Sequence, residues 1–429
     1  MVENIIKNNL QRYFQRLGEF EKAKLYYRNK NDILREKSPA NLGENTKNFD
    51  PFRSADNRIS HNWFNILVNQ KAGYLFSYPP TFDVKDSKIN KKVVQILGDD
   101  FAKICKDLCI EASCFGVSYL HYWKETGLKF ASIDPSQIIP IYSNGIKKEL
   151  SAVLRVYDDE IFGENTTICE YWDKYMVYAY IYDGNLKPYK KFTDGKHFYS
   201  HEFAKVPFVE FRNNNLAESD LVSVKALIDV YDKIFSGFVN DIEDIQQVIL
   251  VLTNYGGEDL QGFLSDLKRY KAIDMQKDSD DSSSGISTMS IDIPIEARCR
   301  LLEMTRKQIF VAGQGVDPQN SDFGITSGVA LKHLYGLLDL KCGLLESEFK
   351  SGFSELIRVI LRHLNIENIT IIEQIFNRAY IQSETEKAEI LAKLANFTSS
   401  YTLAKNNPLV EDFDVEIENL KGEKNERTT

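Results

Sequence analysis

The 429-residue chain lacks an excess of positive charge, a long apolar run and a paired-cysteine motif. It has 53 Lys and Arg against 62 Asp and Glu, and the net charge of −9 argues against wrapping nucleic acid around a basic surface. The amino-terminal stretch "MVENIIKNNLQRYF" lacks the continuous apolar core of a signal peptide. Apolar runs such as "VILVL" at 248–252 are too short to span a bilayer. These absences predict synthesis in the cytoplasm and no membrane partner.

Motifs for catalysis and for metal binding are missing as well. The six cysteines include no CxxC pair, so we expect buried, reduced thiols rather than a metal site. No GxxxxGK[ST], GxSxG or HExxH is present. The loop 277–288, "KDSDDSSSGIST", is acidic but lacks the Gly and Glu of a calcium loop at their required positions. The sequence therefore predicts no catalytic residue, no metal and no cofactor, and a structural protein rather than an enzyme.

The first half of the chain has the pattern of an α+β region. Apolar residues recur at helical spacing over 57–76 and over 91–115. The alternating stretch that follows turns at Glu125-Thr126-Gly127, which predicts a β-hairpin, and strand-like segments continue to about residue 213.

The second half is dominated by three long helical patterns, at 219–247, 294–312 and 328–364, with a β-rich run from 248 onward between the first two. The first and third carry apolar stripes that we expect to exceed what one subunit can cover, which favours a ring of identical subunits. Gly336, Gly343 and Gly352 lie inside the third helix and predict a bend there.

A glycine-rich stretch, "VAGQGVDPQNSDFGITSGVALKHL", joins the second and third helices. It has four glycines and two aspartates, and no Lys or Arg precedes Lys332. The glycines predict a mobile loop, because glycine adopts backbone conformations that other residues avoid.

This order of elements resembles the portal (head–tail connector) proteins of tailed double-stranded-DNA bacteriophages, of the siphophage type found in Gram-positive hosts. The resemblance covers about residues 50 to 420. It is carried by "NRISHNWFNILVNQKAGYLFSYPPTF", "SQIIPIYSN", "PFVEFRNNNLAESDLVSVKALIDVYDKIFSGFVNDIEDIQQVILVLTNYGG" and "SGVALKHLYGLLDLKCGLLESEF".

The resemblance implies an α+β portal fold with long stem helices, a small β-containing clip and a short helical crown. The implied segments, in chain order, are 1–217 for the wing, 218–247 for the first stem helix, 248–292 for the clip, 293–312 for the second stem helix, 313–327 for the tunnel loop, 328–376 for the long bent wing helix with its return strand, and 377–429 for the crown and carboxy-terminal tail.

The implied function is a channel for packaging and ejecting double-stranded DNA, formed by a homododecameric ring at the portal vertex of the virion. The implied partners are the terminase large subunit, a head-completion adaptor protein, the scaffold and the major capsid protein. Two alternatives stay open: a ring-forming protein of a defective phage-like particle, and a DNA-processing enzyme.

A channel through which DNA slides must not grip phosphate, and a loop with acidic and neutral polar residues suits that task. The expected channel residues of the tunnel loop are Gln314, Asp317, Gln319, Asn320, Ser321 and Asp322. The expected channel-facing acids of the first stem helix are Asp229, Asp232, Asp241 and Asp244.

Overall fold

The computed structural model describes residues 2–35, 55–146, 148–161, 164–192, 195–245, 249–253, 285–289, 294–319, 328–366, 368–369, 371–378, 392–394 and 397–399. The chain divides into two compact units. Unit 1 takes residues 1–28, 62–225 and 309–429, and unit 2 takes residues 29–61 and 226–308. The division falls within two long helices, and the finer partition into seven segments stays a prediction.

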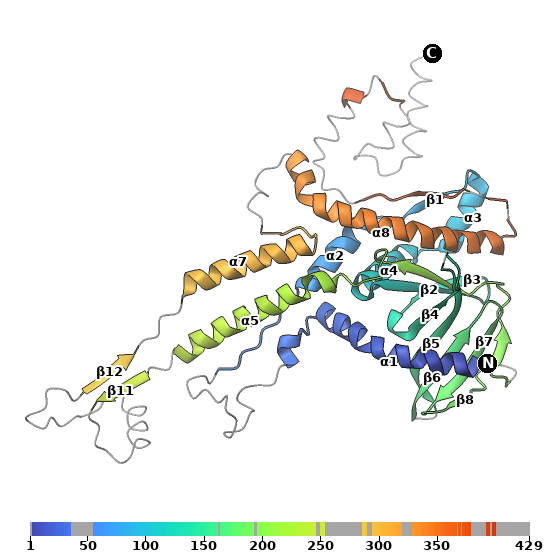
Figure 1. Cartoon of the computed structure of the whole chain (residues 1–429). Coiled ribbons are helices and arrows are strands. Elements are labelled where there is room, and N and C mark those ends of the chain that lie inside the picture. Colours follow the sequence, from blue (N-terminus) through green and yellow to red (C-terminus); the bar gives the residue numbers. More distant parts are fainter. Residues whose placement is uncertain are drawn as a thin grey trace, which may run out of the picture. The chain divides into compact units, whose positions relative to one another are not determined.

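Unit 1 contains one group of helices around a small antiparallel sheet (Figure 1). Its helices are α1 (Val2–Tyr27), α2 (Trp63–Leu75), α3 (Ser87–Leu97), α4 (Phe101–Phe115) and α8 (Gly328–His363). The three-stranded sheet has the order β10-β2-β3, formed by β10 (Phe208–Arg212), β2 (Val117–Lys124) and β3 (Leu128–Ile133). The predicted hairpin is confirmed, because β2 and β3 pair antiparallel on either side of the Glu125–Gly127 turn.

A larger antiparallel sheet lies beside this group. Its main path is β4-β5-β6-β7-β8, and β9 pairs with β7. These strands are β4 (Ile138–Tyr142), β5 (Leu150–Ile161), β6 (Glu164–Trp172), β7 (Met176–Tyr182), β8 (Leu186–Pro188) and β9 (Phe198–Ser200), and the short helix η3 (Pro135–Gln137) precedes β4. Helix α1 packs Ile6 and Leu10 against one face, and Val117 and Tyr119 of β2 cover the other. Apolar residues therefore line both faces of the sheet.

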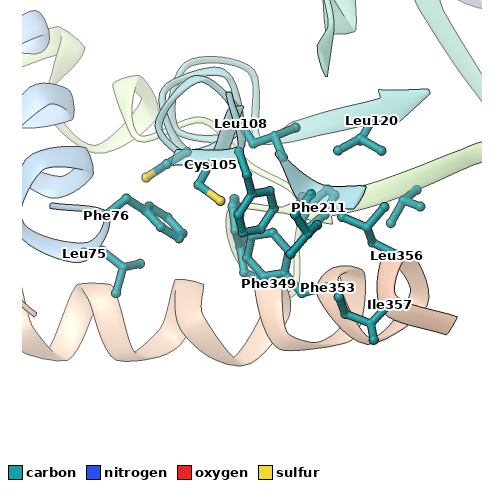
Figure 2. Close-up of a cluster of buried hydrophobic side chains, with 14 of the residues drawn as sticks. Leu75, Phe76, Cys105, Leu108, Leu120, Phe211, Phe349, Phe353, Leu356 and Ile357 are labelled. Atoms are coloured by element: carbon teal, nitrogen blue, oxygen red, sulfur yellow. The ribbon is translucent and has the colours of Figure 1, made fainter. Parts of the chain in front are cut away.

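Helix α8 is the central element of the main core (Figure 2). Phe349 and Phe353 point toward Phe211 of β10, with ring centroids 5.1 and 5.0 Å from it. The buried positions of α8 are Leu338, Cys342, Leu345, Phe349, Phe353, Leu356 and Ile360. This periodicity confirms the apolar stripe, but the same chain covers it, so the expectation that the α8 stripe needs a second subunit is wrong.

The glycines of α8 do not share one role. A Cβ at Gly352 would lie 2.5 Å from the Phe211 ring, so this glycine allows close packing against β10. A Cβ at Gly336 would meet nothing within 4 Å outside the backbone of its own helix. The helix curves near its amino-terminal end (Figure 1).

Unit 2 contains η1 (Asp32–Arg35), most of α5 (Leu221–Ile245), the beginning of α7 (Ile295–Ala312), and the strands β11 (Ile249–Thr253) and β12 (Gly285–Met289). The two strands pair antiparallel, with Ile249 opposite Met289 and Thr253 opposite Gly285. The predicted strand after α5 is confirmed. The expectation of a loop over 277–288 is wrong for residues 285–288, which belong to β12, and residues 277–284 lie outside the described residues.

Other expectations need correction or lie outside the described residues. The helix expected over 91–115 is two helices, since Gly98 at φ +68° ends α3 before α4 begins. The return strand is short, with β13 (Glu373–Ile375) pairing antiparallel with β1 (Thr81–Asp83). Five cysteines are buried, but Cys299 is exposed. Most of the crown, 377–429, and the interval 254–284 lie outside the described residues.

Candidate channel loop and stem acids

The root of the predicted tunnel loop is a helix-ending turn with a defined hydrogen-bond pattern. At the end of α7, the Gly315 amide donates to the Phe310 carbonyl at 2.9 Å, and the Gln314 amide donates to the Val311 carbonyl at 3.1 Å. This pair of bonds is the Schellman motif, in which the residue after the C-cap adopts the left-handed conformation. That residue is Gln314, at φ +53°. A glutamine therefore occupies a position at which glycine is the usual residue.

The two glycines on either side of Gln314 are close-packing residues. A Cβ at Gly313 would lie 2.5 Å from Leu67 of α2, and one at Gly315 would lie 2.3 Å from the same side chain. Neither distance is possible for a real Cβ unless the buried Leu67 side chain, α2 or the loop shifts. The expectation that Gly313 and Gly315 make the loop mobile is therefore wrong at these two positions.

Two side chains from other helices bind the backbone of the loop root. The side-chain Nε2 of Gln70, on α2, donates to the Val316 carbonyl at 2.7 Å, and its Oε1 accepts from the Val316 backbone amide at 3.0 Å. Lys341 of α8 donates from Nζ to the Gly313 carbonyl at 2.8 Å. Val316 is itself buried. Residues 313–316 are thus held on both sides, and we call them the loop root.

A buried ionic cluster lies next to the loop root. The Asp220 carboxylate, directly before α5, is 3.0 Å from the Nζ atoms of both Lys71 and Lys341. Asn213 donates to the other carboxylate oxygen at 2.9 Å. Burial alone would raise the pKa of Asp220, but the two ammonium groups outweigh it and hold that pKa at about 2. Burial also lowers the pKa of Lys341.

Beyond the loop root, the described part of the loop is short. The Asp317 carboxylate accepts the Gln319 amide at 3.0 Å across Pro318, which forms a local turn. Pro318 and Gln319 are exposed, and Gln314 and Asp317 are half-buried. Three of the expected channel residues, Asn320, Ser321 and Asp322, lie outside the described residues.

The expected channel-facing acids of α5 do not form one exposed row. Asp232 has an exposed fraction of 0% and accepts from Asn31 at 2.6 Å and from the His61 amide at 3.0 Å. A side chain in this setting cannot face a channel, so the prediction is wrong for Asp232. Its carboxylate instead connects α5 to the chain segment around His61.

The remaining acids have mixed environments. Asp241 forms an ion pair with Arg298 of α7, which reduces its availability to repel DNA. Asp229 is half-buried, and the side chain of Asp244 lies outside the described residues. For Asp229, Asp241 and Asp244, a channel-facing position stays a prediction.

The residues that hold the loop root and form the ionic cluster beside it were missed from the sequence, although the two lysines, Lys71 and Lys341, carry a usable signal. Lys71 follows Phe64, Leu67 and Val68 at helical spacing, so it occupies a core position of α2. Lys341 lies between the buried Leu338 and Leu345 in the same way. A lysine in an apolar stripe predicts a buried partner of opposite charge. Which partner it finds depends on the fold, because Asp220 is about 150 and 120 positions away in sequence respectively.

Within the described ranges, no group of three or more His, Cys, Asp or Glu is placed to hold a metal ion. Within those ranges, too, no helix has both the length and the apolarity needed to cross a bilayer.

Comparisons with known proteins cover nearly the whole chain. The family described as "Phage portal protein, SPP1 Gp6-like" matches residues 6–429. The portal protein of Clostridium phage phiCD119 is 40% identical over 421 residues, which are 93% of this chain and 91% of that protein. The portal protein of Bacillus phage SPP1 is 28% identical over 394 residues, which are 86% of this chain and 77% of that protein. Among solved structures, a chain from the neck of an empty GTA particle has a TM-score of 0.43 at 11% identity, covering 81% of this chain and 88% of that chain.

Proposed function

Since the chain belongs to the phage portal protein family of the SPP1 Gp6-like type, we propose that it forms a homododecameric ring at one vertex of the capsid. Double-stranded DNA passes through the ring during packaging and ejection. The protein is a virion component that is synthesised and assembled in the host cytoplasm. Its role is mechanical and structural, and we assign it no reaction.

The channel role is supported by the support and the composition of the loop 313–327. Its root is held by α2 and α8, and its sequence has two aspartates and no Lys or Arg. Basic side chains would bind phosphates at every register of the DNA, and each such contact releases counterions and adds affinity. An acidic loop on a fixed support lets the duplex slide without being gripped.

Portal partners follow from the position of the ring at the vertex. The terminase large subunit docks during packaging, and a head-completion adaptor protein replaces it afterwards. The scaffold and the major capsid protein surround the ring during assembly of the head.

The test of the channel role reverses the charge of the loop. In the Asp317→Lys, Asp322→Lys double variant, two new cations per subunit face the DNA, and binding gains a salt-dependent component. We expect rings that assemble but package DNA more slowly, with partial recovery at higher salt. The measurement is the packaged DNA length per particle across ionic strengths.

The matched control is Asp317→Asn, Asp322→Asn, which removes the same negative charges without adding cations. The asparagine introduced at position 317 keeps a side-chain oxygen that can accept the Gln319 amide. The control should package close to the wild-type rate. Wild-type packaging by the lysine variant at low salt would contradict a role for the loop in sliding.

A further inference from the structure

The Lys341 ammonium group contacts both the end of α7 and the residue that precedes α5. Lys341 Nζ donates to the Gly313 carbonyl, which is among the last carbonyls of α7, and it forms an ion pair with Asp220, which directly precedes α5. The carboxyl end of a helix favours a cation, and the amino end favours an anion. Lys341 places its cation at the carboxyl end of α7, and Asp220 places its anion at the amino end of α5. Both side chains are largely shielded from water.

The second support of the loop root is the Gln70 side chain, which bonds to the backbone of Val316 in place of another backbone segment. Its amide makes two hydrogen bonds to Val316, one to the carbonyl and one to the amide, as a neighbouring β-strand would. The close approach of Leu67 to Gly313 and Gly315 prevents the same segment from moving toward α2. The loop root is therefore fixed by hydrogen bonds, by an ion pair and by steric contact.

We propose that Gln70 and Lys341 are positioning residues of the channel loop, which hold its root, residues 313–316, in one conformation. The effect on DNA packaging rests on the proposed function. If the loop lines the channel, a loop that moved from Gly313 onward would change the width of the channel.

Charge balance makes Lys341 a practical residue to test. The cluster holds two lysines, Lys71 and Lys341, against the single acid Asp220. Lys341→Met leaves Asp220 paired with Lys71, so no buried acid loses its last partner. We expect this variant to fold, whereas Asp220→Asn would leave two buried cations facing each other.

The experiment measures the loop root directly in the full-length assembled protein. Hydrogen–deuterium exchange of peptides over 313–319 reports the protection of the Val316 amide. In Gln70→Ala that amide loses its acceptor, and we expect exchange roughly tenfold faster. A nitroxide on Gln319→Cys, in a Cys299→Ser background, should give a narrower spectrum in Gln70→Ala and in Lys341→Met.

Controls and a conservative variant separate positioning from general destabilisation. Asn69→Ala changes the neighbouring residue of α2, and Lys350→Met removes a half-exposed lysine of α8 that pairs with Glu346. Both should leave exchange and nitroxide mobility at the wild-type level. Lys341→Arg keeps the cation and should restore most of the confinement that Lys341→Met loses.

Packaged DNA length per particle completes the test. Faster exchange and greater mobility together with defective packaging support the positioning role. Unchanged exchange and mobility in both Gln70→Ala and Lys341→Met overturn it, whatever the packaging result. A mobile root with normal packaging would also overturn the positioning role, and it would leave the portal function of the ring intact.

Discussion

Gln314 shows how one residue can hold a conformation that its type disfavours. Its left-handed backbone satisfies two carbonyls at the end of α7, and glycine would do this without steric cost. The neighbouring glycines are needed for a different reason, because Leu67 leaves no room for a side chain at either position. A glutamine at the strained position suggests that its side chain has a use outside the fold.

Replacing Gln314 with glycine tests whether this position is strained. Gln314→Gly should stabilise the protein by about 1 kcal/mol, because the left-handed conformation costs roughly that much for a residue with a Cβ. Gln314→Val should destabilise it, since β-branched residues tolerate this conformation least. Chemical denaturation of the three proteins measures the difference. Equal stabilities would show that Gln314 is not strained.

Glu111 predicts a pH dependence of stability. Burial raises the pKa of Glu111 to about 8, and the carboxylates of Asp134 and Asp107 add to the effect. The folded state thus binds this proton more tightly than the unfolded state, whose glutamate titrates near pH 4.3. The stability contribution is complete below about pH 4 and declines as pH rises to about 8.

The variant Glu111→Gln removes this titration and can still accept the Ser132 hydroxyl hydrogen bond. We expect the variant to be more stable than the wild type at pH 8, and the gap to shrink at pH 5. Thermal denaturation at both pH values provides the measurement. A gap of the same size at both values would argue against a buried titrating carboxyl group.

At the scale of elements, α8 combines two surfaces with different purposes. One stripe packs into the core around Phe211, and the opposite side exposes Leu337, Leu340 and Leu344. The buried stripe was predictable, because a period of 3.6 residues identifies the face of a helix. Which partner covers that face was not predictable, since periodicity carries no information about neighbours distant in sequence.

Two glycines of α8 form a matched pair for testing the packing against β10. Gly352→Ala would place a methyl group 2.5 Å from the Phe211 ring, and overpacking of this kind costs about 1–3 kcal/mol. Gly336→Ala meets nothing within 4 Å and should stabilise the helix by about 1 kcal/mol. Denaturant midpoints of the two variants should move in opposite directions. A shift of both in one direction would contradict the packing role of Gly352.

At the scale of the whole molecule, exposed apolar side chains on two helices favour assembly. Leu340 and Leu344 of α8 are each 66% exposed, and Leu301 and Met304 of α7 are 45% and 54% exposed. Apolar residues in such rows commonly mark protein–protein interfaces. In the proposed ring, a neighbouring subunit covers them.

The double variant Leu340→Lys, Leu344→Lys tests this surface. We expect a folded subunit that no longer forms rings, because the lysines face solvent in the monomer and become buried in the assembly. Native mass spectrometry measures the subunit number, and circular dichroism checks the fold. Val94→Lys, on the exposed side of α3, is the control and should assemble normally. Intact rings of the double variant would place the interface elsewhere.

The sequence by itself determined the elements and their order. Helical periodicity located α5, α7 and α8 to within a few residues, and alternation located the hairpin β2–β3, because both signals are local. The portal resemblance followed from the same order, together with long stretches of matching sequence. The absence of Lys and Arg from the loop 313–327 was also visible without a structure.

Only the tertiary structure decided which residues hold that loop and which acids are available to face a channel. Gln70 and Lys341 come from two helices and Asp220 from the start of a third, and their contacts depend on how those helices pack. The sequence predicted a channel-facing Asp232, yet its carboxylate is buried and accepts hydrogen bonds from Asn31 and His61. Charge patterns along a helix report which side chains share a face, but burial depends on what another part of the chain brings to that face.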